Sequence, residues 1–386
     1  MNTAEFESVQ APVVRAGKRL EVFLITNTLE TGGTERQFAT LAQNLPGQDL
    51  HVRLGCLRKE GTFAADLEAL EEFSPGGSLY GWRSMQARRA LARHLRQNQV
   101  TVAQSFDFYS NLMMIPAARM AGTPVVIGSH RQLGDLLGGP QFWAMTTVLG
   151  FCDRVVCNSQ AAAESLRKRG ISSGKLAVIP NALPDAAFEM VAPALPRKAG
   201  VLRVGMVARM NDSRKNHEGF LRVAAKVAAA RSNAEFVLVG DGPLRSGIEQ
   251  YARSLGIAER VLFLGDRRDI PEVLAALDVS VLTSLSESLS NVIMESMAAG
   301  VPVVAGHVGG NAELVRDGAT GFLVGAKDDE AFAAAVVKLL DGSEMRASFG
   351  ANAKSEARSR FGVRKICALY EEMYRSVLAE KGLTAC

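Results

Sequence analysis

The sequence predicts an α/β protein made of two similar units in tandem, each with a parallel sheet and crossover helices. Short β-branched strand candidates alternate with longer amphipathic stretches along the whole chain, which is typical of parallel sheets. A proline-rich stretch without periodicity interrupts this pattern near the middle, and the pattern then starts again. A chain of 386 residues is also longer than most single-core domains. We therefore expect two Rossmann-like domains.

The N-terminal half begins with a buried strand at residues 21–26 (EVFLIT), which leads through Gly32 and Gly33 into a helical pattern. Its other strand candidates are residues 51–55, 100–105, 125–129, 154–158 and 178–180. We place this domain at residues 18–195. Residues 1–17 are expected to be a flexible tail, because they lack the apolar core of a signal peptide.

The C-terminal half begins after a linker punctuated by Pro180, Pro184, Pro193 and Pro196. Its strand candidates are residues 201–208, 235–239, 261–264, 279–283, 302–305 and 321–324. We place this domain at residues 196–361. Residues 361–380 carry apolar side chains at helical spacing and form a final amphipathic helix, within a terminal segment at 362–386.

Composition excludes several classes of protein. The net charge of +4 is too small to indicate nucleic-acid binding. The five cysteines are scattered and include no CxxC pair, so neither a zinc site nor a disulfide framework is indicated. No apolar stretch is long enough to span a membrane. These features predict a protein of the reducing cytoplasm.

The strongest functional signal is at residues 284–304, SLSESLSNVIMESMAAGVPVV. A strand ends near Thr283, a Ser-rich turn follows, and a helix begins at Asn291, so backbone N–H groups are available to an anionic phosphate. Glu287 lies just before this helix and Glu295 about one turn inside it. One can face a sugar, while the other can accept hydrogen bonds from a ribose diol. Taken alone, the two glutamates fit a helix-start charge and a solvated helix residue better.

The surrounding residues change this interpretation. Glu287 and Glu295 form an E-x7-E motif followed by MAAGVPVVAGHVGGNAELVRDGATGFLV, and in this the chain resembles the retaining glycosyltransferases of family 4. The resemblance covers nearly the whole chain after the tail. It implies the GT-B fold, in which two Rossmann-like domains face each other across a cleft and the final helix crosses back to the N-terminal domain.

The resemblance also implies roles for the residues of the motif. Glu295 would hold the ribose hydroxyls of the nucleotide, and Glu287 would contact the donor sugar. The backbone amides of Leu289, Ser290 and Asn291 would contact sugar hydroxyls and phosphate. Ser288 stands where the family often has glycine, which leaves the identity of the donor sugar open.

Two cations follow the first strand of the C-terminal half, in VGMVARMNDSRKNHEGF at residues 204–220. Arg209 comes at the end of the strand and Lys215 in the adjoining loop. They suit a diphosphate, whose negative charge grows as the glycosidic bond breaks. A pair of surface cations is the alternative, and the resemblance favours diphosphate binding.

Three further residues of this half are candidates for the nucleotide pocket. Gly240 and Gly242 follow a strand in FVLVGDGPLR, where glycine lets a backbone approach a ligand closely or form a tight turn. The resemblance favours the wall of the pocket. It also places the loop LGDRRD at the base edge of the nucleotide, with Arg267 as the candidate contact.

In the N-terminal half, TLETGGTERQ resembles the glycine-rich first loop of the family. Gly32 and Gly33 would let backbone amides reach the phosphates across the cleft, while Glu35 favours the start of the helix. His130 follows the strand VVIGS and aligns with a histidine at the family's reaction centre. A lone histidine is more often structural. Cleft closure would bring Gly33 and His130 to the donor.

The N-terminal half also contains a basic stretch. Residues 73–106 contain no Asp or Glu but include Arg83, Arg88, Arg89, Arg93 and Arg96. Of these, Arg89, Arg93 and Arg96 share one helical face. Trp82 and Met85 lie just before them. This pattern fits a solvated helix face, or a peripheral contact with the anionic inner face of the cytoplasmic membrane.

The sequence thus predicts transfer of a hexose-type sugar, with retention, from a UDP- or GDP-sugar to a glycan or lipid-linked acceptor such as a polysaccharide intermediate. No cofactor is expected, and no metal, because members of the family generally need none and no DxD follows a strand. Another GT-B sugar-nucleotide enzyme, an epimerase or a sugar-phosphate-forming transferase, is the alternative, and an inactive sugar-nucleotide binder is a further one. An NAD-dependent oxidoreductase would need GxGxxG, which neither NTLETGGTE nor ARMNDSRKN supplies.

Overall fold

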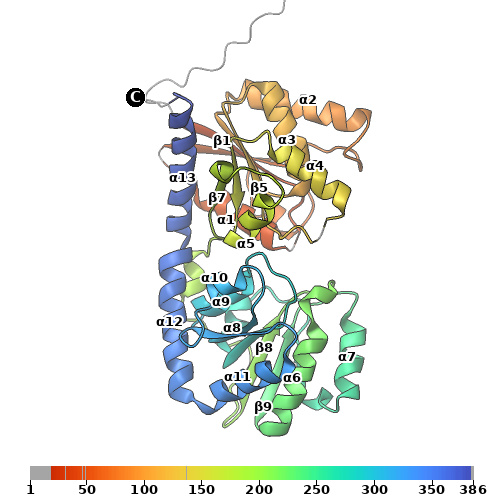
Figure 1. Ribbon diagram of the computed structural model, residues 1–386, viewed down its shortest axis with the longest axis vertical. Coiled ribbons are helices and arrows are strands. Elements are labelled where there is room, and N and C mark those ends of the chain that lie inside the picture. The colour runs from red at the N-terminus through yellow and green to blue at the C-terminus, as the bar shows by residue number, and fades with distance from the viewer. Residues whose placement is uncertain (1–18, 31, 46, 48, 136, 384–386) are drawn as a thin grey trace, which may run out of the picture. The chain divides into compact units, whose positions relative to one another are not determined.

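The chain forms two compact α/β units (Figure 1). The structure is a computed structural model that describes residues 19–30, 32–45, 47, 49–135 and 137–383. The first unit consists of Met1–Ala182 and Val363–Cys386, and the second of Leu183–Gly362. Each unit contains one fully parallel sheet, so the predicted fold class is confirmed. The expected tail at residues 1–17 lies outside the described residues.

The first unit has a seven-stranded sheet in the order β3-β2-β1-β4-β5-β6-β7. Its strands are β1 (Leu20–Thr26), β2 (Leu50–Cys56), β3 (Leu70–Glu72), β4 (Val102–Ser105), β5 (Val125–His130), β6 (Arg154–Cys157) and β7 (Leu176–Val178). Its α-helices are α1 (Gly33–Asn44), α2 (Trp82–Gln97), α3 (Phe108–Ala121), α4 (Gly139–Leu149), α5 (Gln160–Arg167) and α13 (Val363–Glu380).

Helices cover both faces of this sheet. Buried residues of α1 and α13 share one apolar core with the strands, and buried residues of α2, α3, α4 and α5 share another. The long helix α13, dark blue in Figure 1, belongs to the first core through the fully buried Tyr370 and Tyr374. The Tyr374 hydroxyl donates to Gln104 Oε1 on β4 at 2.6 Å. The last helix is therefore part of the hydrophobic core of the first unit.

The second unit has a six-stranded sheet in the order β10-β9-β8-β11-β12-β13. Its strands are β8 (Leu202–Val207), β9 (Ala234–Val239), β10 (Val261–Phe263), β11 (Val279–Leu282), β12 (Val303–Gly306) and β13 (Gly321–Val324). Its α-helices are α6 (His217–Ala230), α7 (Arg245–Ser254), α8 (Ile270–Ala275), α9 (Asn291–Ala298), α10 (Asn311–Leu314), α11 (Asp329–Asp341) and α12 (Ser343–Phe361). The short helix η4 (Ser213–Lys215) joins β8 to α6.

The boundary between the units falls after Ala182, whereas the sequence predicted it after residue 195. The Leu183 N–H donates to the Phe361 carbonyl at 2.8 Å, and Phe188 is buried in the core of the second unit. The Ala194 N–H donates to the Glu272 carbonyl at 2.8 Å. Prolines break the periodicity of this segment, but its backbone and apolar side chains still dock on the second unit.

Two further details differ from the expected elements. The short edge strand β3 was not predicted, and β7 ends at Val178, where the predicted strand began. The final helix predicted at residues 361–380 is observed as α13, which starts at Val363 directly after α12 ends at Phe361. None of the helices in the described part of the chain combines the length and apolar character needed to cross a membrane.

Candidate functional site

The strand order of the second unit points to one place for a ligand. From β8 the chain moves outward to β9 and β10 on one side, and β11 then lies on the other side of β8. In an open parallel sheet, ligands bind outside the carboxyl ends of the strands where the order reverses. This point lies between β8 and β11. The loops that leave these two strands carry Arg209, Lys215, Glu287 and the start of α9.

Hydrogen bonds fasten these two loops to each other. The Asn216 Nδ2 donates to the Thr283 carbonyl at 3.1 Å, and the Thr283 hydroxyl donates to the Asn216 carbonyl at 2.8 Å. The Leu285 N–H donates to the Arg214 carbonyl at 2.8 Å. Asn216 has the left-handed backbone conformation (φ 55°), and its Oδ1 accepts from the Gly219 N–H at the start of α6. The position of Lys215, between Arg214 and Asn216, is thereby fixed relative to the loop after β11.

Lys215 and Glu287 form an ion pair across the switch point. The Lys215 Nζ lies 2.6 Å from Glu287 Oε1, and the exposed fractions of the two side chains are 33% and 10%. An ammonium has three N–H donors, and this contact occupies one of them. Glu287 thus orients the lysine, and the partly exposed ammonium keeps the capacity to bind an anion.

Arg209 provides a second cation at the same end of the sheet. It follows β8 directly after Ala208 and is exposed. Its guanidinium forms no ion pair with any residue that the structure describes. Together with Lys215, it makes this edge of the sheet suitable for a group of high negative charge, such as a diphosphate.

The start of α9 lies in the loop after β11. Ser290 is the N-cap, and its buried hydroxyl accepts from the Ile293 N–H at 3.3 Å, while the Leu289 side chain is buried in the core. Both side chains are therefore occupied, and a ligand contact at Leu289 or Ser290 would involve the backbone amides. Glu295 is half-buried in α9, on the second turn.

Gly240 and Gly242 pack against the protein's own backbone. Their φ angles are 123° and 148°, and a Cβ on Gly240 would lie 2.2 Å from the Ala208 carbonyl oxygen. A Cβ on Gly242 would lie 2.6 Å from the carbonyl of Met210. These glycines let the loop after β9 support the segment that carries Arg209. Their predicted contact with the nucleotide remains a prediction.

Arg267 lies in the loop after β10. Its Nε donates to Asp269 Oδ1 at 2.8 Å, and this contact raises the pKa of the guanidinium and lowers the pKa of the carboxyl group. A role in base recognition would require Arg267 to bind with its planar face or with donors that Asp269 leaves available.

His130 is the last residue of β5 in the first unit, and its side chain is buried. Its Nε2 lies 3.0 Å from the Ser165 hydroxyl, which itself donates to the Ala162 carbonyl at 2.8 Å. The hydroxyl proton is thus in use, so His130 Nε2 is the donor and Nδ1 is unprotonated. Burial lowers the pKa of His130 to about 4, and the imidazole is neutral at pH 7.

His130 also lines a cavity of about 380 Å³ within the first unit. The other residues around it include Asp107 and Arg131, which the sequence analysis did not single out. Asp107 caps α3 by accepting from the Tyr109 and Ser110 N–H groups. Arg131 donates to Asn181 Oδ1 at 2.7 Å and to the Tyr370 hydroxyl at 2.8 Å. The cavity is therefore lined by both polar and apolar side chains, and its walls are held by a capped helix and by a hydrogen bond to α13.

The glycine pair of the first unit lies at the start of α1. Gly32 is the N-cap and Gly33 the first helical residue, and Gly32 has extended backbone (φ −141°). Glu35 lies in the first turn, as expected for a carboxylate near a helix N-terminus. No group of three or more metal-ligating side chains occurs among the described residues.

Two family models match the chain, and together they cover most of it. A model described as "Glycosyltransferase Family 4" matches residues 31–186, and one described as "Glycosyl transferases group 1" matches residues 202–342. The chain belongs to glycosyltransferase family 4. The predicted resemblance is thus confirmed, and so is the prediction that the chain belongs to a family of glycosyltransferases.

Family 4 relatives match different shares of the chain. N-acetyl-alpha-D-glucosaminyl L-malate synthase of Bacillus anthracis is 35% identical over 42% of this chain and 42% of its own length. D-inositol 3-phosphate glycosyltransferase 2 of Catenulispora acidiphila is 35% identical over 59% of this chain and 57% of its own length. The match thus spans about half the length of these two relatives. The UDP-Gal:alpha-D-GlcNAc-diphosphoundecaprenol alpha-1,3-galactosyltransferase of Escherichia coli is 25% identical over 78% of this chain and 81% of its own length.

A solved structure of the same fold comes from Anabaena. Alr3699/HepE in complex with UDP superposes with a TM-score of 0.81 at 22% identity, over 92% of this chain and all of that chain. The GT-B fold of family 4 is therefore shared. At this identity the superposition supports the fold, and the roles of individual residues rest on the geometry described above.

Proposed function

We propose that the chain transfers a sugar from a UDP- or GDP-sugar to a hydroxyl of a glycan or lipid-linked acceptor, with retention of configuration. The observation that carries the proposal is the Lys215–Glu287 pair across the switch point of the second sheet, beside the exposed Arg209. The names of similar proteins support it: the HepE structure contains UDP, and the E. coli relative is named for a UDP-galactose donor and a diphosphoundecaprenol-linked acceptor.

In the proposed reaction, Arg209 and Lys215 bind the diphosphate and stabilise the charge that develops as it leaves. Glu287 orients Lys215 and contacts the donor sugar, while Glu295 accepts hydrogen bonds from the ribose hydroxyls. The backbone amides at the start of α9 bind phosphate and sugar oxygens. The acceptor hydroxyl attacks the anomeric carbon on the face from which the diphosphate departs; the bond from that carbon to the diphosphate oxygen breaks, and the hydroxyl proton passes to the departing diphosphate, so the configuration is retained. The proposal needs no metal ion.

We extend the proposal to the location of the protein, in the cytoplasm. Cys56, Cys152, Cys157 and Cys367 are free thiols, as expected in a reducing compartment. Burial raises the pKa of Cys152 and Cys157 to about 12, so these thiols are inert structural residues at neutral pH.

Calorimetric titration with UDP, GDP, ADP and NAD, without added metal, tests the donor site. We expect one nucleoside diphosphate to bind and NAD not to bind. The Glu295→Ala variant should bind that nucleotide at least tenfold more weakly, because about two hydrogen bonds to a charged group are lost. Glu330→Ala, on the exposed side of α11, is the matched control and should bind like the wild type. Binding of NAD alone, or an unchanged affinity of Glu295→Ala, would refute the assignment.

A second measurement tests the stereochemistry. Once a donor is known, the anomeric configuration of the product bond can be read by NMR from the coupling at the anomeric carbon. The same configuration as in the donor is expected. An inverted product would refute the retaining reaction and leave the nucleotide site intact.

A further inference from the structure

Three neighbouring helices of the first unit form a layer without acidic residues. α2, α3 and α4 pack on one face of the sheet, and their sequences contain no Asp or Glu. α2 alone carries five arginines: Arg83, Arg88, Arg89, Arg93 and Arg96. On other elements of the same unit, Arg53, Arg154 and Arg167 each pair with a glutamate. The positive charge of α2 is not balanced within its own layer.

The two sides of α2 differ in composition. Ala87, Leu91 and Leu95 are buried against the sheet. Arg83, Arg89 and Arg93 are exposed, and none of them forms an ion pair with a residue in the described ranges. Unpaired cations on one exposed helix face attract an anionic partner, because their field is not cancelled locally.

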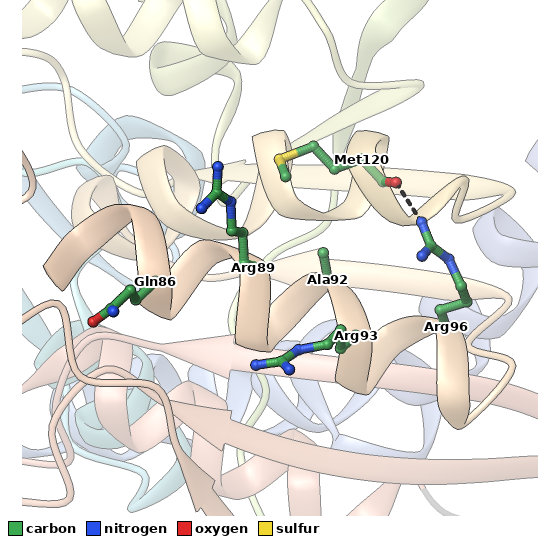
Figure 2. Close-up of a pocket in the computed structure, with 6 residues that line it drawn as sticks. All are labelled: Gln86, Arg89, Ala92, Arg93, Arg96 and Met120. Atoms are coloured by element: carbon green, nitrogen blue, oxygen red, sulfur yellow. Dashed lines mark hydrogen bonds between the residues drawn. The ribbon is translucent and has the colours of Figure 1, made fainter. Parts of the chain in front are cut away.

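Three of the five arginines of α2 line a shallow groove between α2 and α3. We call it the basic groove; its volume is about 480 Å³, and it is lined by Gln86, Arg89, Ala92, Arg93, Arg96 and Met120. Figure 2 shows the arginines on α2 and Met120 on α3, with Arg96 donating to the Met120 carbonyl at 2.8 Å. Guanidinium groups bind phosphate with paired hydrogen bonds. The groove therefore fits phosphate groups.

Exposed tryptophans accompany the arginines. The chain has two tryptophans, Trp82 at the start of α2 and Trp143 in α4, and they are 68% and 70% exposed. The Arg89 guanidinium lies over the Trp82 ring, 5.9 Å from its centre, and Met85 is also exposed. Tryptophan prefers the boundary between lipid headgroups and acyl chains, whereas large exposed aromatic side chains are unfavourable in water.

We propose that the basic groove and Trp82 form a docking surface for an anionic lipid bilayer. The arginines of the groove bind the phosphates of the headgroups, and Trp82 and Met85 enter the interfacial region. The combination favours a bilayer over a dissolved anion, because a dissolved anion would leave the exposed aromatic and thioether groups in water. This proposal does not rest on the transfer reaction, and its test measures binding alone.

Co-sedimentation of the full chain with lipid vesicles tests the docking surface. We expect binding to phosphatidylcholine vesicles that contain phosphatidylglycerol, weaker binding at high salt, and little binding to phosphatidylcholine alone. Arg89→Ser/Arg93→Ser should lower the partition coefficient about 30-fold, since each basic side chain near the surface contributes about a fivefold factor. Arg253→Ser/Lys338→Ser, on the second unit, removes the same charge and should bind like the wild type. Equal binding of the two double variants, or no binding to either vesicle, would refute the proposal.

Tryptophan fluorescence provides an independent measurement. In the Trp143→Phe variant, Trp82 is the single tryptophan, and its emission should shift to the blue when phosphatidylglycerol vesicles are added. Inorganic phosphate at the same anion concentration should leave the emission unchanged. A shift with phosphate alone would indicate a free-anion site in place of a membrane surface. An unchanged emission with vesicles would show that Trp82 does not enter the interface, and either result would overturn the proposal.

Discussion

The ion pair between Lys215 and Glu287 leads to a prediction that distinguishes an effect on stability from an effect on catalysis. The Lys215→Met substitution keeps most of the apolar stem and removes the charge that faces Glu287. The Glu287 side chain is only 10% exposed, so solvent replaces the lost partner incompletely. We expect the free energy of unfolding of the second unit to fall by about 2 kcal/mol, as when a buried polar group loses its partner.

The same substitution removes a cation from the proposed diphosphate site. We expect kcat to fall roughly 100- to 1000-fold, the loss found when one preorganised group facing a developing charge is removed. The double variant Lys215→Met/Glu287→Gln no longer has an unpaired buried carboxylate. It should therefore regain most of the stability and none of the activity.

Urea unfolding and steady-state kinetics check both halves of this prediction. The unfolding transition that shifts on addition of the bound nucleotide is the one to compare, because ligand binding stabilises the folded unit that holds it. Release of nucleoside diphosphate gives kcat. If the single variant kept wild-type kcat, or if the double variant recovered it, Lys215 would serve only to neutralise Glu287 and the proposed role in leaving-group stabilisation would be refuted.

Three further predictions follow from single residues. Gly240→Ala should destabilise the second unit by about 3 kcal/mol in thermal melts, because φ is 123° and the new Cβ would lie 2.2 Å from a carbonyl oxygen. In the control variant Gly247→Ala, in α7, the new Cβ meets nothing within 4 Å, and the substitution should be neutral or slightly stabilising. His130 has its pKa lowered from 6.5 to about 4, so the unfolded chain takes up this proton first as the pH falls. Stability should therefore decrease from pH 6.5 to pH 4, by about 3 kcal/mol in total, and this part of the slope should disappear in His130→Gln. Asn216→Gly should be about 1 kcal/mol more stable than Asn216→Ala, because both lose the same hydrogen bonds and only alanine is strained at φ 55°; equal stabilities would contradict this.

The fold was predictable because its signals are local. Each β-branched run and each amphipathic stretch reports its own element, and all but one of the strands of both sheets were expected near their observed positions. The missed strand, Leu70–Glu72, is three residues long and too short to show a period. The unit boundary at Ala182 was harder to predict, because the docking of Phe188 depends on a core built from distant residues.

Sequence reasoning proposes the residues of the candidate site, but it does not supply the contacts among them. Lys215 and Glu287 are 72 positions apart, and only the pairing of β8 with β11 brings them together. Arg131 was missed because its partners, Asn181 and Tyr370, are 50 and 239 positions away. Asp107 did leave a local signal, since an Asp after a strand with a Ser three positions later is a capping pattern.

The return of α13 to the first unit affects the order in which the protein can fold during synthesis. The second unit is one continuous segment, Leu183–Gly362, whereas the first unit needs Tyr370 and Tyr374 for its core. A ribosome therefore completes the segment of the second unit before it supplies the last helix of the first. The N-terminal sheet, although made earliest, therefore cannot complete its apolar core until the whole segment of the second unit has been synthesised.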